Sequence, residues 1–242
     1  MRIYRGLKPI KAMTFDLDDT LYDNWPVIMK VEKEMAQWLY QKHPVSASLS
    51  LEEWQGIKQQ VASENPNLKH DVTVWRETQI KRGLLQLGYS QQQAEQAARE
   101  GIEHALWLRN QVDVPQETHR VMAELSQRIP LVAITNGNVD PYKIGLGQYF
   151  QLILKAGPNG RAKPYPDMFD KAQQYLGVDA INILHVGDHL RTDVYGSKQN
   201  GFQACWFNDI GSNLYLSSKA SVLPDVEIEQ LSDLMRLIER LL

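Results

Sequence analysis

Short apolar runs bounded by turn-forming residues recur along the chain. One lies near the start, at residues 12–15, and four follow Pro115, at residues 131–134, 152–154, 183–186 and 204–207. Uninterrupted apolar runs of this length are typical of strands that are buried on both faces of a sheet. Amphipathic helical patterns occur between or after them, at residues 116–128, 167–176 and 193–200. This alternation predicts an α/β fold with a Rossmann-like, doubly wound parallel sheet.

Residues 25–110 carry a different pattern, because they contain no convincing strand and are far longer than an ordinary connection. Val27, Val31 and Met35 fall on one helical face. Ser50 and Ser90 each open a capping-box sequence, which marks the start of a helix. The segment therefore reads as a set of helices inserted after the first strand.

The length of the chain agrees with such an insertion. At roughly 150 residues per domain, 242 residues correspond to about 1.6 domains. We expect a core domain of residues 1–22 and 112–242 and a helical cap domain of residues 23–111. The end of the chain is also amphipathic and predicts a last helix that carries Leu234, Leu237, Ile238 and Leu241.

Composition and charge narrow the class of partner. Lys and Arg number 26 against 29 Asp and Glu, which gives a net charge of −3, and the basic residues do not cluster. The chain thus lacks the electrostatic footprint of a protein that binds nucleic acid or anionic lipid. No apolar run approaches the ~18 residues of a membrane helix. We expect a cytoplasmic protein that acts on a small molecule, with Cys205 as a buried thiol.

The strongest chemical signal follows the first predicted strand. There Asp16, Asp18 and Asp19 come directly after an apolar run, although carboxylates are costly to bury unless a cation or a partner stabilises them. In an open α/β sheet, ligands bind outside the carboxyl ends of the strands, which is where these residues fall. Other strand ends and nearby loops supply the further polar residues Thr135, Asn136, Lys163, Asp188 and Asp193. The sequence therefore predicts one polar crevice at this edge.

These residues form four motifs in a fixed order. They are D-x-D-x-T at Asp16 to Thr20, a threonine at Thr135, Lys163-Pro164, and G-D-x-x-x-x-D at Gly187 to Asp193. In this order they resemble the haloacid dehalogenase superfamily, and specifically its phosphatases with a helical cap of the C1 type. The resemblance covers the whole α/β portion, and the helical insertion lies where the family carries its cap.

The resemblance implies a mechanism for the hydrolysis of a phosphomonoester. Asp16 is the expected nucleophile and forms an aspartyl-phosphate, while Asp18 is the expected general acid and base. Mg²⁺ is the implied cofactor, bound by the side chains of Asp16 and Asp188 and the backbone carbonyl of Asp18. Lys163 is expected to act beside the nucleophile as a further catalytic cation.

Further residues receive supporting roles from the same resemblance. Thr135, Lys163 and the backbone N–H of Asn136 are expected to bind the phosphate. Asp193 and Thr20 are expected to hold these groups and the metal ligands in place.

Tyr22, Asp23, Trp75 and Arg76 are candidate substrate contacts, because an aromatic ring can stack on a substrate ring and an arginine can bind an anion. His189 departs from the second acidic residue that many relatives carry, which bears on metal binding or its pH dependence.

Three other functions stay open at this point. A phosphosugar mutase and a 2-haloacid dehalogenase belong to the same superfamily, and a phospho-accepting signalling module uses a similar set of groups. Asp18 disfavours the dehalogenase, because a departing halide needs no proton. The inserted helices and the position of Asp16 after the first strand disfavour the signalling module. A phosphatase is the preferred interpretation.

Overall fold

The computed structural model describes residues 1–241, with side chains through residue 239. The chain forms two compact units, one of Met1–Asp23 with Asp113–Leu242 and one of Asn24–Val112. We call them the core unit and the helical unit. Their boundaries differ by one residue from those expected for the two domains.

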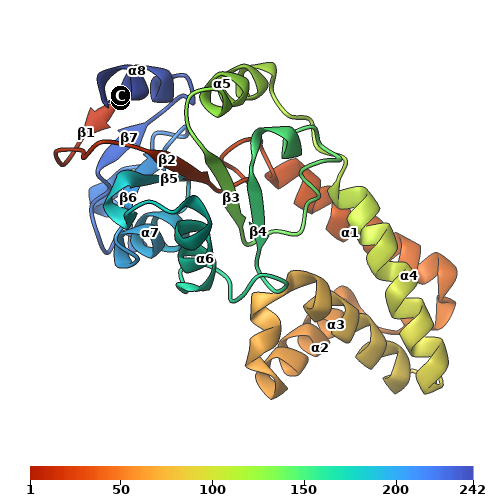
Figure 1. The fold of residues 1–242 in the computed structure, drawn as a ribbon. Coiled ribbons are helices and arrows are strands. Elements are labelled where there is room, and N and C mark those ends of the chain that lie inside the picture. Colours follow the sequence, from red (N-terminus) through yellow and green to blue (C-terminus); the bar gives the residue numbers. More distant parts are fainter. Residues whose placement is uncertain (242) are drawn as a thin grey trace. The chain divides into compact units, whose positions relative to one another are not determined.

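A seven-stranded sheet organises the core unit, in the order β1-β7-β6-β5-β2-β3-β4 (Figure 1). β1 pairs antiparallel with β7 and the other pairs are parallel, so the predicted fold class is confirmed. The strands are β1 (Arg2–Ile3), β2 (Ala12–Phe15), β3 (Leu131–Thr135), β4 (Leu152–Lys155), β5 (Ile183–Gly187), β6 (Gln203–Phe207) and β7 (Val226–Ile228).

All five predicted strands are present, and four of them extend one residue beyond their apolar run. β1 and β7 were not predicted. They have two and three residues, and both residues of β1 are exposed, so neither strand produces a run that stands out in the sequence. Both lie at one end of the sheet, where short strands are common.

Helices cover both faces of this sheet. α5 (Gln116–Ser126) and α8 (Asp233–Leu241) lie on one face, and α6 (Asp167–Leu176) and α7 (Gly196–Gln199) lie on the other (Figure 1). Leu234, Leu237 and Ile238 of α8 are buried, as expected, while the side chain at position 241 lies outside the described residues. Short helices occur at η3 (Gly147–Tyr149), η4 (Ala180–Asn182) and η6 (Leu214–Leu216).

The helix predicted at residues 193–200 is wrong in its start and its type. A π-helix, η5 (Leu190–Tyr195), precedes α7. His189 caps the start of this helix, because its Nδ1 accepts a hydrogen bond from the backbone N–H of Thr192 at 3.2 Å. The apolar pattern of the sequence gives no sign of this cap.

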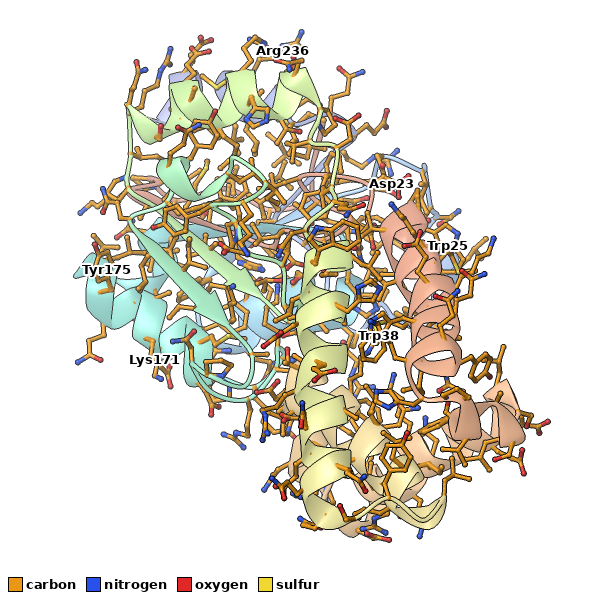
Figure 2. The ribbon with its side chains drawn as sticks, turned by 90° about the vertical axis from the view of Figure 1, so that its right-hand side faces the viewer. Asp23, Trp25, Trp38, Lys171, Tyr175 and Arg236 are labelled. Atoms are coloured by element: carbon orange, nitrogen blue, oxygen red, sulfur yellow. The ribbon has the colours of Figure 1, made fainter. Side chains whose placement is uncertain are left out.

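The helical unit contains α1 (Trp25–Lys42), α2 (Leu51–Glu64), α3 (Val72–Gln86) and α4 (Gln91–Arg109), with short helices η1 (Pro44–Ser48) and η2 (Pro66–His70). Both predicted capping boxes form, at Ser50 and at Ser90. Trp38 of α1, which is labelled in Figure 2, stacks on His104 of α4 with 5.6 Å between the ring centroids. No described helix is both long and apolar enough to span a bilayer.

Candidate active site

Three neighbouring strands of the core unit end beside each other and deliver the polar residues. β2 pairs in parallel with β3 and β5, so that Phe15 lies opposite Ala133 and Val186. Asp16 follows β2 directly, Thr135 ends β3, and Asp188 follows β5. The crossovers of the sheet thus bring together residues that are far apart in the sequence.

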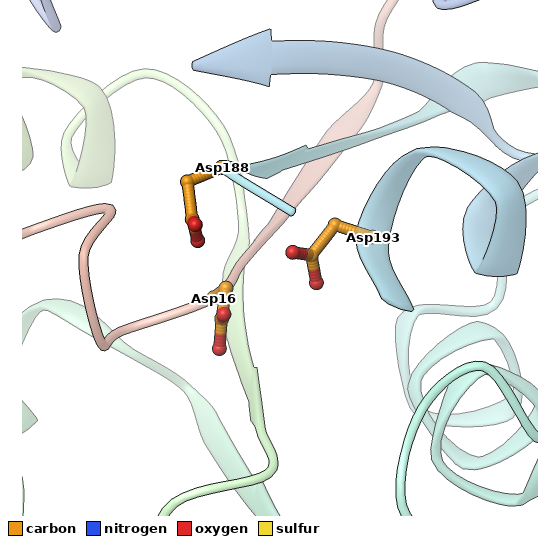
Figure 3. Close-up of side chains that lie close together, drawn as sticks. All are labelled: Asp16, Asp188 and Asp193. Carbon is orange, nitrogen blue, oxygen red and sulfur yellow. The ribbon is translucent and has the colours of Figure 1, made fainter. Parts of the chain in front are cut away.

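Three carboxylates from these segments form a cluster. Asp16, Asp188 and Asp193 each offer one carboxylate oxygen, and these oxygens lie within 4.8 Å of one another (Figure 3). Asp16 and Asp193 are buried, whereas Asp188 is partly exposed. Carboxylates so close together repel one another and need a compensating positive charge.

Lys163 supplies part of that charge. Its side chain is buried, and its Nζ lies 2.6 Å from Oδ1 of Asp193 and 3.0 Å from Oδ1 of Asp16. The side chain of Asn136 fixes the backbone of Lys163, because its Oδ1 accepts from the Lys163 N–H at 2.7 Å and its Nδ2 donates to the Lys163 carbonyl at 3.0 Å. The Asn136 side chain therefore positions Lys163. The group of Asn136 that is a candidate phosphate donor is its backbone N–H.

Asp193 is fixed from several sides. Besides Lys163, the backbone N–H of His189 donates to its Oδ2 at 3.0 Å. Gly187 allows this close approach, since a Cβ at that position would lie 2.5 Å from the Cβ of Asp193. The glycine of the G-D-x-x-x-x-D motif is thus required by the aspartate at the other end of the motif.

His185 contacts this network and was missed in the sequence. It is buried in β5, with its Nε2 3.3 Å from Oδ1 of Asp193 and its Nδ1 2.8 Å from the hydroxyl of Thr14. Burial lowers the pKa of His185, so the neutral ring donates from Nε2 and accepts at Nδ1. The only signal available was a histidine within an otherwise apolar strand.

The charges in the cluster shift the pKa values of its members in opposite directions. Burial raises the pKa of Asp16 well above its usual value, although Lys163 opposes this shift. Burial and the charges of Asp193 and Asp19 raise the pKa of Asp188 to about 7. For Asp193, burial is outweighed by Lys163 and His185, which lower the pKa. Asp193 is therefore the stable anion, and Asp16 and Asp188 lack sufficient positive charge.

Neighbouring groups hold the remaining predicted residues. The hydroxyl of Thr20 accepts from the backbone N–H of Asp188 at 3.1 Å and donates to Oδ1 of Asp188 at 3.2 Å. The hydroxyl of Thr135 accepts from the N–H of Gly137 at 3.0 Å and donates to no acceptor among residues 1–241. The buried Tyr22 donates its hydroxyl hydrogen to the carboxylate of Asp18.

The candidate substrate residues fall in both units. Tyr22 and Asp23 belong to the core unit, and Asp23 is exposed. Trp75 and Arg76 belong to α3 of the helical unit. The Trp75 indole packs against the apolar core of that unit and donates to the carbonyl of Lys58 at 2.8 Å. Trp75 is thus part of the packing of the helical unit.

The cluster has the donor set of a hard divalent cation. The Oδ1 of Asp16 is buried and accepts no hydrogen bond of suitable geometry from the described residues, among which Lys163 is the one cation paired with it. Asp188 has a raised pKa in the absence of a cation. Oxygen donors with excess negative charge suit Mg²⁺. Asp193 has its oxygens occupied by protein donors, which leaves Asp16 and Asp188 as the carboxylates that fit a metal.

Sequence comparison identifies the family. The model of haloacid dehalogenase-like hydrolases matches residues 10–201. The chain belongs to this family. The resemblance found in the four motifs is therefore confirmed, and the order of these motifs corresponds to the strand ends at which the cluster forms.

The similar proteins include phosphatases that align with this chain over most of their length. The chain is 45% identical over 239 residues to the 5-amino-6-(5-phospho-D-ribitylamino)uracil phosphatase YigB of Escherichia coli (strain K12), covering 98% of this chain and 100% of that protein. It is 30% identical to a phosphoglycolate phosphatase of Neisseria gonorrhoeae (strain ATCC 700825 / FA 1090), covering 81% and 79%. The chain is thus a phosphatase of the haloacid dehalogenase-like family, as predicted, and its substrates are small phosphorylated molecules.

A solved structure agrees with the fold. The 2-haloacid dehalogenase from Pseudomonas syringae pv. Tomato DC3000 is 36% identical, with a TM-score of 0.89 and coverage of 96% of this chain and 99% of that one. The shared architecture therefore serves proteins described as phosphatases and as dehalogenases, and residues of the site must distinguish the two reactions.

Proposed function

We propose that the protein is a Mg²⁺-dependent phosphomonoester hydrolase that acts through an aspartyl-phosphate on Asp16. The observation that carries this proposal is the buried carboxylate of Asp16, 3.0 Å from Lys163 and clustered with Asp188. The Asp16 carboxylate is buried at the end of β2, beside the Lys163 ammonium. It is suited to attack a phosphoryl group that Lys163 and Mg²⁺ would hold.

The reaction consists of two displacements at phosphorus. A carboxylate oxygen of Asp16 forms a bond to phosphorus while the bond from phosphorus to the leaving oxygen breaks. Asp18 gives its proton to that oxygen, which leaves as an alcohol. Asp18 then takes a proton from a water molecule, whose oxygen displaces Asp16 and releases inorganic phosphate. Tyr22 holds the Asp18 carboxylate by a hydrogen bond and so orients it.

The metal and the basic groups divide the charge of the phosphate among them. Asp16, Asp188 and the backbone carbonyl of Asp18 would hold Mg²⁺, which when bound neutralises the repulsion between the nucleophile and the phosphate. Lys163 is oriented by Asn136 and Asp193 and donates to phosphoryl oxygens. Thr135 donates its hydroxyl hydrogen, and the Asn136 backbone N–H adds a second neutral donor. Thr20 orients Asp188.

The proposed substrate is 5-amino-6-(5-phospho-D-ribitylamino)uracil, a riboflavin precursor, with FMN and sugar phosphates as further substrates. The support is the full-length similarity to the Escherichia coli phosphatase that is named for this compound. Tyr22 and Asp23 are the proposed substrate contacts next to the catalytic loop, and residues 23–111 are proposed as the cap domain.

Dehalogenation is the reaction named for the Pseudomonas syringae neighbour, and it serves as the contrasting activity in the test. Asp18 favours phosphoryl transfer, since an alkoxide requires a proton on departure and a halide does not. The deciding experiment measures phosphate release from a panel of phosphorylated metabolites, with and without Mg²⁺, and halide release from 2-chloropropionate. We expect Mg²⁺-dependent phosphate release without halide release. Halide release alone, or phosphate release that persists in EDTA, would overturn the proposal.

Replacing Asp18 by asparagine is expected to lower kcat by about 10²- to 10⁴-fold, the usual contribution of a general acid and base. Asparagine keeps the shape but has no acidic proton to transfer. The effect should be larger for an alkyl phosphate than for p-nitrophenyl phosphate, whose leaving group needs no protonation. Steady-state kinetics with both substrates test this through kcat/KM, which reports the first displacement alone. Equal losses in kcat/KM for the two substrates would contradict the assignment of Asp18 as general acid.

The apparent affinity for Mg²⁺ is expected to fall as the pH decreases below about 7. The raised pKa of Asp188 means that a proton occupies this carboxylate at lower pH and must leave before the metal binds. One such proton weakens binding by about tenfold per pH unit in that range. Titration calorimetry at pH 6 and pH 8 measures the change. An Asp188→Asn variant is the control and should bind weakly at both values; a pH-independent affinity in the wild type would contradict the prediction.

A further inference from the structure

The helical unit contains a cavity of about 100 Å³ between α1, α2 and α3. Its apolar walls include Met35, Leu39, Trp54 and Ile80. Two cations also line it, Lys58 from α2 and Arg76 from α3, and Glu32 from α1 is the acidic side chain among the lining residues. The lining thus carries one positive charge in excess within a largely apolar enclosure.

Neither cation has an acceptor among the described residues. Among residues 1–241, the Arg76 guanidinium and the Lys58 ammonium make no hydrogen bond and no ion pair. The Lys58 ammonium lies 4.9 Å from the centroid of the Trp75 ring. Burial lowers the pKa of both side chains, and the charge of Glu32 opposes the shift only in part. An arginine offers five N–H donors, and none of the Arg76 nitrogens is a fully buried atom without a partner, so they are accessible to a ligand that enters the cavity.

Two other cations of α3 are paired. Lys81 and Arg82, also on α3, lie 2.7 Å from the carboxylates of Glu95 and Glu64. The absence of such partners at Arg76 therefore does not extend along the whole of α3.

The walls of the cavity are fixed by contacts between α2 and α3. The Trp75 indole donates to the carbonyl of Lys58 at 2.8 Å, and Nε2 of Gln79 donates to the carbonyl of Trp54 at 2.7 Å. Gly83 approaches so closely that a Cβ there would overlap the ring of Trp54. These contacts fix α2 and α3, which carry the two cations, against each other before any ligand binds. The cavity walls therefore need little rearrangement on binding, which reduces its cost.

We propose that this cavity binds the terminal oxyanion of a small metabolite through Arg76 and Lys58. A phosphate or carboxylate group matches the planar fork of arginine with two parallel hydrogen bonds, and the lysine adds a second charge. An enclosed apolar cavity of about 150 Å³ holds a benzene molecule. The volume of about 100 Å³ in this pocket, which is partly open to solvent, therefore takes an end group of a few heavy atoms. The apolar walls contact the short carbon chain behind the anion.

Binding without turnover tests the site itself. The full chain, kept metal-free with EDTA, is dialysed to equilibrium against radiolabelled inorganic phosphate and, separately, labelled acetate. We expect the wild type to bind one anion in the cavity. Arg76→Gln and Lys58→Gln should each weaken the affinity for that anion at least tenfold. Arg82→Gln, on the same helix but outside the cavity, is the matched control and should leave the affinity unchanged. Because no reaction is measured, the result is independent of the reaction proposed for the core unit.

A variant that misfolds would give a false loss, so two further measurements accompany the dialysis. Thermal unfolding should be similar in Arg76→Gln and wild type. Arg76→Lys, which keeps the charge and loses the fork, should recover part of the affinity. Unchanged binding of both anions in Arg76→Gln, or equal weakening in Arg82→Gln, would overturn the proposal.

Kinetics of the Mg²⁺-loaded enzyme distinguish the two sources of such an anion. If the substrate supplies it, Arg76→Gln raises KM at least tenfold for a phosphorylated carboxylic acid or a bisphosphate and leaves KM for phenyl phosphate unchanged. If a separate ion supplies it, KM stays unchanged for all three, and added acetate alters the rate of wild type but not of Arg76→Gln. A rise in KM that is equal for every substrate would contradict a site for a second anion.

Discussion

Replacing Asp16 by asparagine is expected to lower kcat by at least about 10⁴-fold while the protein stays folded. The amide lacks the negative charge that forms the bond to phosphorus, so neither displacement can begin. Lys163 keeps its 2.6 Å ion pair with Asp193 in this variant, and the side chain keeps its shape. Phosphate release at saturating Mg²⁺ and substrate measures the loss.

The control for this variant is Asp179→Asn, which removes an exposed carboxylate from the same unit and should leave kcat unchanged. Acid quenching during turnover should trap phosphate covalently on the wild type and not on Asp16→Asn. Residual activity within tenfold of wild type, or covalent phosphate on the variant, would show that another group is the nucleophile.

Replacing Asp193 by asparagine is expected to lower the free energy of unfolding by about 3–5 kcal/mol, the usual cost of removing one partner of a buried ion pair. The change leaves the buried Lys163 with Asp16 alone and weakens the contact from His185. Urea denaturation of the metal-free protein measures the difference. The variant should also lose activity, because Lys163 is no longer held from both sides.

The exposed pair of Arg128 and Glu124 is the matched control, with 2.6 Å between its charged atoms. Glu124→Gln should change the free energy of unfolding by less than about 1 kcal/mol, because solvent screens exposed pairs. Since the pKa of Asp193 is lowered in the folded state, its contribution is present at neutral pH and is lost only as the pH falls below about 4. A loss below 1 kcal/mol at pH 7 in Asp193→Asn would contradict this account.

The sequence was sufficient for the elements that depend on local pattern. The five apolar runs became strands, and Ser50 and Ser90 capped their helices, because burial and capping leave a signal within a few residues. The convergence of Asp16, Asp188 and Lys163 followed from the topology of a parallel sheet, in which strand ends share one edge.

Other features depend on contacts between distant residues and left no pattern. His185 looks like a polar interruption of a strand until Thr14 and Asp193 are placed beside its two nitrogens. The side chain of Asn136 was assigned no structural role, yet it fixes the backbone of Lys163 27 residues away. The lack of partners at Arg76 is likewise visible only once every neighbouring acceptor has a position.

The long separations across β2 and β5 also bear on the order of folding. Thr14 contacts His185 across 171 residues, and Thr20 contacts Asp188 across 168. Closing such loops costs chain entropy before these contacts can form, whereas the contacts within each helix of residues 24–112 are local. Helical structure in that insertion is therefore expected to form before the catalytic groups meet. Regain of hydrolysis after dilution from denaturant should lag behind regain of helical circular dichroism.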